Sequence, residues 1–87
     1  MELQEQLKLL PEKPGVYLMK NAEGRIIYIG KAVSLKNRVR SYFQAARNLT
    51  SKVVSMVGQV HDLEYITTSN EVEALILESN LIKKHKP

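Results

Sequence analysis

Two short apolar segments joined by a turn sequence constrain the fold of this chain more than any other feature. The segments GVYLMK (15–20) and RIIYIG (25–30) have the length and the aromatic and β-branched content of strands. The NAEG sequence between them is typical of a turn, so we expect a β-hairpin. A two- or four-residue loop pairs Val16 with Ile29 and Tyr17 with Tyr28, which puts both phenols on one face.

The rest of the chain predicts four helices and one further strand. Proline ends a helix at the preceding residue, so Pro11 closes the first helix. Thr68 and Glu71 have the spacing of a capping box and open the last one. The expected order, α-β-β-α-α-β-α, predicts an α+β fold with a small three-stranded antiparallel sheet flanked by helices. The expected helices are 3–10, 34–46, 50–60 (with Val53, Val54, Val57 and Val60 packing inward) and 68–84, and the third strand is 62–68.

Length and composition exclude several classes of protein. With 87 residues the chain makes one small domain, 1–87, with a modest core. The chain has no cysteine, which excludes disulfides and thiolate metal sites. No apolar run approaches the ~18 residues of a membrane span. We therefore expect a soluble cytoplasmic protein without a membrane partner.

The positive charge is concentrated in one part of the sequence. Residues 24–61 contain no Asp or Glu, although the net charge of the whole chain is only +4. Such a one-signed stretch favours a polyanion, most often nucleic acid, although an ordinary basic surface is the simpler alternative. The basic residues in this stretch are Arg25, Lys31, Lys36, Arg38, Arg40, Arg47 and Lys52.

The helix expected over 34–46 carries two arginines, Arg38 and Arg40, on different sides. Helical spacing puts Arg38 on the flank of the apolar stripe, one turn before Tyr42. Arg38 is therefore either a site residue or a side chain that covers the core while keeping its charge in water. Arg40 is more easily explained as a solvated or phosphate-contacting charge. The stripe itself is formed by Leu35, Val39, Tyr42 and Ala46, and the opposite side carries Lys36, Arg40 and Arg47.

Glu78 is the least expected residue of the last helix, because its neighbours one turn away on both sides are apolar. A carboxylate in such a setting needs a cation or hydrogen bonds. A partner arginine or exposure at the edge of the stripe would explain it, and so would a role as metal ligand or acid–base group. Glu71 and Glu73 lie in the first turn, where they complement the helix dipole.

Taken together, these residues resemble the GIY-YIG nucleases. GVY (15–17) and YIG (28–30) correspond to the two signature tripeptides, with Val16 where the family name has isoleucine. The resemblance runs from about residue 11 to 87 and includes YIGKAVSLKNRVRSYF and EVEALILESNLIKKHKP. It implies an endonuclease that cuts one strand of damaged double-stranded DNA on the 3′ side of a lesion in bacterial nucleotide excision repair.

The resemblance also implies what surrounds this domain. It indicates an N-terminal catalytic module excised from a longer protein that engages a UvrB-like partner through regions absent from this chain. The family asparagine of the site is expected a few residues beyond Pro87, so no residue here takes that role. The alternatives are a basic DNA-binding module without chemistry and a GIY-YIG nuclease of another class.

Roles for individual residues follow from the same resemblance. Glu78 corresponds to the carboxylate that binds one Mg²⁺ or Mn²⁺ ion, and Tyr28 to the group that receives the proton of the attacking water. Arg38 corresponds to the arginine that stabilises the transition-state charge, and we expect Arg38 and Lys31 to lower the pKa of Tyr28. Gly30 is expected to let a phosphate approach closely. Tyr17, Lys31 and Tyr42 are supporting groups, and the DNA contacts are Lys31, Lys36, Arg38, Arg40 and Arg47.

Overall fold

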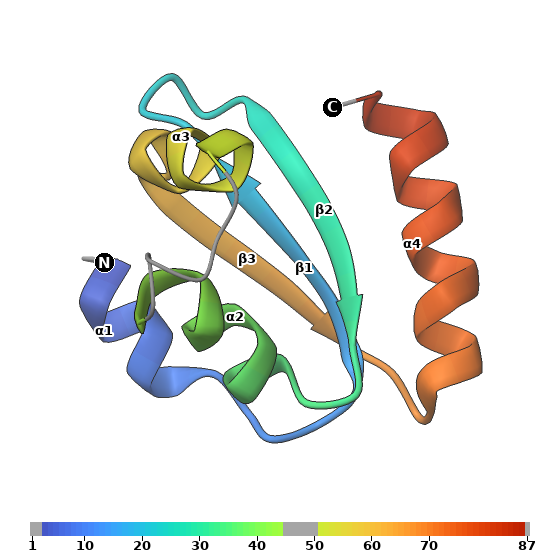
Figure 1. Cartoon of the computed structure of the whole chain (residues 1–87). Helices are drawn as coiled ribbons and strands as arrows, with labels where there is room; N and C mark the ends of the chain where they lie inside the picture. Colours follow the sequence, from blue (N-terminus) through green and yellow to red (C-terminus); the bar gives the residue numbers. More distant parts are fainter. Residues whose placement is uncertain (1–2, 45–50, 87) are drawn as a thin grey trace.

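The structure, a computed structural model, describes residues 3–44 and 51–86. The seven expected elements follow one another in the predicted order (Figure 1). They are α1 (Leu3–Leu9), β1 (Gly15–Lys20), β2 (Ile26–Ala32), α2 (Leu35–Gln44), α3 (Ser51–Gln59), β3 (Asp62–Thr67) and α4 (Glu71–His85).

The three strands form one antiparallel sheet in the order β2-β1-β3, so β1 is central and β2 is an edge strand. One face of the sheet carries α1, α2 and α3, and α4 packs on the other face against β2 and β1 (Figure 1). Because side chains of a strand alternate between faces, β1 supplies both cores. Tyr17 and Met19 point toward the first three helices, and Val16 and Leu18 point toward α4.

The hairpin register differs from the expected one by two residues. Leu18 pairs with Ile29 and Tyr17 with Gly30, and a bulge follows Met19. A three-residue loop, which Asn21 closes by donating its N–H to the Arg25 carbonyl, shifts the pairing by one residue, and the bulge shifts it by one more. The total shift of two residues leaves residues 28–32 on their expected faces, but the bulge puts Ile27 on the face of Tyr28 and Ile26 on the α4 face. Tyr17 and Tyr28 therefore share a face as predicted, but as diagonal rather than directly opposed neighbours.

The helix boundaries agree closely with the predictions, with one misplaced cap. The N-cap of α4 is Asn70, not Thr68, because the Asn70 side chain accepts the Glu73 N–H at 2.8 Å. Val57 in α3 and Val60 directly after it pack against the core as expected, whereas Val54 is exposed, so its predicted burial is wrong. Ala46 and Arg47, and the side chain of Val53, lie outside the described residues.

Helix α4 is apolar on two sides. Ala74, Leu77 and Leu81 pack against the sheet. The side facing away exposes four large apolar residues, Val72, Leu75, Ile76 and Ile82. Even so, none of the helices in the described part of the chain is long and apolar enough to cross a membrane.

Candidate active site

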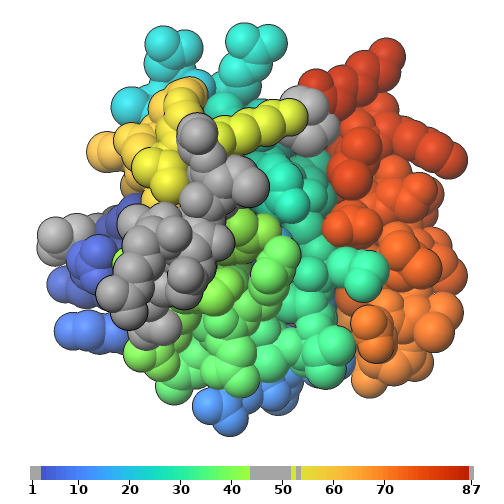
Figure 2. Space-filling view, in the orientation of Figure 1, coloured from blue at the N-terminus to red at the C-terminus, as the bar shows by residue number. Residues whose placement is uncertain are grey.

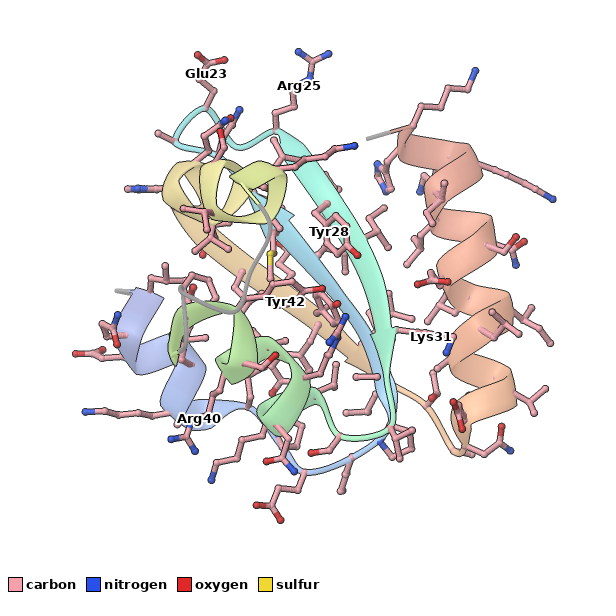
Figure 3. All side chains as sticks on the ribbon, in the orientation of Figure 1. Glu23, Arg25, Tyr28, Lys31, Arg40 and Tyr42 are labelled. Carbon is pink, nitrogen blue, oxygen red and sulfur yellow. The ribbon has the colours of Figure 1, made fainter. Side chains whose placement is uncertain are left out.

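Three tyrosines and one arginine meet on the sheet face that carries α2. Tyr17 comes from β1, Tyr28 from β2, and Tyr42 and Arg38 from α2. The ring centroids form a nearly equilateral triangle, with separations of 6.1 Å for Tyr17–Tyr28, 6.0 Å for Tyr17–Tyr42 and 6.1 Å for Tyr28–Tyr42. These separations and the tilted rings are those of favourable aromatic contacts. We call these four residues the tyrosine–arginine cluster; Figure 3 labels Tyr28 and Tyr42, which lie close together in its view.

Tyr17 is the buried centre of the cluster, with an exposed fraction of 1%. Its hydroxyl lies 3.0 Å from the Tyr42 hydroxyl, and each can serve as donor or acceptor. Burial, followed by this hydrogen bond, raises the pKa of Tyr17 far above its ordinary value. Tyr17 is therefore a neutral phenol that orients Tyr42 rather than a source of charge.

Gly30 is required by Tyr17 in this structure. A Cβ at position 30 would overlap the Tyr17 hydroxyl oxygen and ring carbon Cζ, because the phenol lies across the glycine. The expectation that the glycine leaves room for a phosphate needs correction, because a side chain of the protein fills that space. Gly15, the glycine of the first tripeptide, is required for a similar reason, because a Cβ there would overlap the Ile66 carbonyl oxygen of β3.

Arg38 lies at the solvent side of the cluster. Its guanidinium carbon is 5.0 Å from the centroid of the Tyr42 ring, within the range of a cation–π contact. Interaction with the Tyr17 hydroxyl raises the pKa of Arg38, so its positive charge is permanent. The side chain is exposed, which leaves its donors available for an anion. Arg40 points away from the cluster on the other side of α2 (Figure 3).

Tyr28 is half-buried, and its hydroxyl is a weaker acid than that of an ordinary tyrosine, with a raised pKa. Hydrogen bonding with Tyr42 is the main cause that raises the pKa of Tyr28, and partial burial adds to it. The charge of Arg38 lowers this pKa, but the net shift is upward. The expectation that nearby cations give Tyr28 a lowered pKa is therefore wrong for the protein alone.

Lys31 and Glu78 do not belong to the tyrosine–arginine cluster. Lys31 pairs with Val16 in the sheet, so it points toward α4, and its Nζ lies 3.6 Å from a carboxylate oxygen of Glu71. Glu78 lies two turns after Glu71 on the same flank of α4 and is half-buried. Since β2 is an edge strand, groups from both faces can meet in the solvent beyond its free edge. Figure 2 shows α2, β2 and α4 next to one another on a single surface.

The carboxylate of Glu78 fits a single divalent cation that keeps most of its waters. Among the described residues, Glu78 takes part in no ion pair, and no three His, Cys, Asp or Glu side chains cluster. Mg²⁺ is commonly bound through one or two carboxylates while it keeps several waters. Of the two simpler explanations of Glu78, a partner arginine is not found among the residues that the structure describes, whereas exposure at the edge of the stripe agrees with its half-buried position.

The other proposed DNA contacts lie apart from the cluster. Lys36 and Arg40 line a groove of about 300 Å³ between α1 and α2, together with Lys8 and Phe43. This groove is on the far flank of α2 from Arg38, so it is not the candidate active site. Arg47 lies outside the described residues.

One residue near the cluster was not predicted from the sequence. Tyr65 of β3 pairs with Tyr17 of β1, so it lies on the same face of the sheet, and it is 43% exposed. The alternation in DLEYIT, with Leu63 buried and Tyr65 two residues later, is the signal that would have assigned it to this face.

The antiparallel sheet with both tyrosine tripeptides on adjacent strands and an arginine helix over them defines a domain of the GIY-YIG class. The family model described as UvrC-like GIY-YIG domain matches residues 13–87, and the chain belongs to this family. The chain is 68% identical over 87 residues to UvrABC system protein C of Symbiobacterium thermophilum, and 62% identical over 86 residues to that of Clostridioides difficile. It spans only 14% of the length of these relatives.

Solved structures give the same result for the fold. The GIY-YIG N-terminal endonuclease domain of UvrC from Thermotoga maritima, bound to its catalytic divalent cation magnesium, superposes with a TM-score of 0.84. It is 49% identical to this chain, and the match covers 97% of this chain and 90% of that one. Further structures of the Thermotoga domain carry single tyrosine-to-phenylalanine substitutions or an asparagine-to-alanine substitution, each bound to the cation.

Proposed function

We propose that this chain is a divalent-metal-dependent endodeoxyribonuclease domain that hydrolyses one phosphodiester on the 3′ side of a lesion in bacterial nucleotide excision repair. The observation that carries the proposal is the tyrosine–arginine cluster at the edge of the sheet. A permanent, exposed cation next to three clustered phenols suits a phosphate whose charge grows in the transition state. Family membership and the magnesium-bound Thermotoga domain support the same reaction.

Arg38 and Tyr28 have distinct roles in this proposal. Arg38 binds the scissile phosphate and stabilises its developing charge, and the ring of Tyr42 holds the guanidinium in position. Tyr28 orients the attacking water and accepts its proton. Because the pKa of Tyr28 is raised in the protein alone, its hydroxyl is neutral until other groups of the assembled complex favour the phenolate.

Glu78 is proposed to hold one Mg²⁺ or Mn²⁺ ion at the edge of β2. When bound, such an ion polarises the phosphate and stabilises the leaving oxygen. Glu71 already has a cationic partner in Lys31, which leaves Glu78 as the carboxylate available to the metal on this flank of α4. A single carboxylate distinguishes this site from a two-metal nuclease.

The assignment to repair extends to partners of the longer protein. We propose that this domain acts at the N-terminus of a longer protein and that damaged double-stranded DNA is delivered by a UvrB-like partner, which binds outside residues 1–87. The relatives named UvrABC system protein C, which this chain matches over 14% of their length, support that arrangement.

Metal-dependent nicking of supercoiled plasmid by the chain tests the proposal. The wild type should nick in Mg²⁺ or Mn²⁺ and not in EDTA. Glu78→Gln should reduce the rate by roughly 10²-fold or more, because an uncharged ligand binds the ion poorly. Glu71→Gln, on the same flank of the same helix, is the matched control. Its nicking rate should stay within about threefold of the wild-type rate, since an exposed ion pair contributes little.

Two results would contradict the proposal. A Glu78→Gln variant that nicks at the wild-type rate would remove the metal site from this residue. DNA binding without nicking by any variant under any metal condition would favour the basic binding module. The 3′ assignment is tested separately on an end-labelled lesion duplex loaded with the partner, where a cut on the 5′ side would overturn it.

A further inference from the structure

A second basic feature lies along the same edge strand as the tyrosine–arginine cluster. A hollow of about 670 Å³ opens where the β1–β2 hairpin, the end of α3 and the end of α4 meet. We call it the edge hollow. It is lined by Lys20, Asn21, Gly24, Arg25, Ile26, Ile27, Gln59, His85 and Lys86.

The edge hollow adjoins the candidate active site directly. Ile26 and Ile27 are the residues of β2 that precede Tyr28. The hollow also reaches both sides of the sheet, because Gln59 ends α3 on one face and His85 ends α4 on the other. It therefore spans the free edge of β2, where the two halves of the proposed site meet.

The charge of the edge hollow suits a phosphate rather than a metal or an apolar ligand. None of the described residues that line it is acidic, and Asn21 and Gln59 add amide donors. Arg25 projects from the start of β2 into solvent (Figure 3) and is in no described ion pair. Basic residues at the end of α4 also complement the helix dipole, but that explanation does not extend to Arg25 at the hairpin.

We propose that the edge hollow binds the phosphate backbone of the DNA strand that is being cut, through Arg25 and Lys86. This inference rests on the proposed nuclease function and adds the path of the strand. Arg25 lies three residues before Tyr28, about 10 Å along β2. Lys86 lies eight residues after Glu78, about 12 Å along α4. Both cations are therefore offset from the reacting groups by a similar distance.

The offset predicts which phosphate is bound. One DNA strand carries a charge every 3.4 Å along the helix axis, so about 10 Å corresponds to about three nucleotides from the scissile phosphate. A strand that follows the edge of β2 would contact the edge hollow first and reach Tyr28 and Arg38 about three nucleotides further on.

Equilibrium DNA binding tests the inference independently of catalysis. The probe is a fluorescent 20-base-pair duplex in EDTA, titrated with the chain at several salt concentrations. The double variant Arg25→Gln, Lys86→Gln should bind roughly tenfold more weakly or worse, and the slope of log K against log salt should fall by about 2. The control variant Lys13→Gln removes one charge from the exposed connection between α1 and β1, outside the groove of Lys36 and Arg40, and should change the slope by less than about 0.5.

The outcomes separate the path of the strand from the reaction. If Lys13→Gln changes the slope by as much per removed charge as the Arg25/Lys86 double variant does, the inference is overturned and only long-range charge is left. A wild type without measurable binding would overturn it too. The nicking assay in Mn²⁺ is run on the same proteins. If no protein nicks DNA but the Arg25/Lys86 variant still binds DNA more weakly than the control, the edge hollow is a DNA-binding site and the nuclease function is wrong.

Discussion

The phenol ring of Tyr17 lies directly across Gly30, so the first tyrosine tripeptide is packed onto the glycine of the second. Gly30→Ala should push this ring aside, since the neighbouring atoms belong to a buried side chain without room to move. Overpacking of this kind costs about 1–3 kcal/mol of the free energy of unfolding. It should also disturb the contact between the Tyr17 and Tyr42 hydroxyls and slow nicking. Urea unfolding and the plasmid assay measure the two effects.

Gly58→Ala is the matched control for this prediction. Position 58 lies in α3 with no heavy atom within 4 Å of a new Cβ. Alanine is the better helix former there, so the variant should be as stable as the wild type or more stable by up to about 1 kcal/mol. A Gly30→Ala protein with the stability of Gly58→Ala would show that the ring has room to move.

Arg38 and Arg40 give a second prediction, because they lie two residues apart on α2 but on opposite flanks. Arg38→Ala should lower kcat for incision by about 10²–10³-fold, the usual loss when a group that stabilises transition-state charge is removed. Arg40→Ala removes the same charge from the far flank and should act through KM alone. Rates at saturating DNA distinguish them, and an Arg38→Ala variant that only raises KM, with kcat unchanged, would make Arg38 a positioning contact.

Asp62 predicts how stability depends on pH. The Gln6 side chain and the Leu63 N–H donate hydrogen bonds to its carboxylate, and they lower the pKa of Asp62 below its ordinary value, Gln6 having the larger effect. A lowered folded-state pKa adds stability above the unfolded pKa of about 3.9, and this contribution is lost as the pH falls through the folded value. Stability should therefore decline below about pH 4.

Asp62→Asn tests the assignment by urea unfolding at pH 6 and pH 3. The variant keeps the shape of the side chain but cannot titrate, so its stability should fall less than that of the wild type between these two pH values. Gln6→Met removes the hydrogen-bond donor from α1 and should likewise reduce the loss of stability between pH 6 and pH 3. If both variants lose as much stability as the wild type between pH 6 and pH 3, the pH dependence belongs to other carboxylates.

Local sequence signals predicted the elements of this fold well, and they failed where geometry depends on a few atoms. Strand alternation placed Tyr17 and Tyr28 on one face, and helical spacing placed Arg38 beside Tyr42. The register was wrong because the Asn21 side chain closes a three-residue loop and a bulge follows Met19, and turn composition alone predicts neither. The cap of α4 was misplaced because Thr68 and Asn70 both have suitable side chains, and only the structure selects Asn70.

The candidate site was less predictable than the fold, because its properties come from residues distant in sequence. Nothing in the sequence near Gly30 indicates that Tyr17 covers it. The direction of the Tyr28 pKa shift likewise depends on Tyr42, fourteen positions later. The hydrogen bond with Tyr42 raises this pKa more than the positive charge of Arg38 lowers it. Spacing along a helix or strand identified the groups that meet but not which of them dominates.

The raised pKa of Tyr28 makes a final prediction about the pH dependence of incision. If the Tyr28 phenolate accepts the proton of water, the rate should rise about tenfold per pH unit below this pKa, since the phenolate fraction grows with pH. Tyr42→Phe removes the main cause of the upward shift, so the rise of the incision rate should begin at lower pH. Tyr28→Phe should lose this rise and lower the rate by about 10²–10⁴-fold. Rates at saturating DNA and Mg²⁺ between pH 6 and 10 measure all three proteins. A rise that persists in Tyr28→Phe would assign the titration to a metal-bound water and leave Tyr28 as a residue that only orients it.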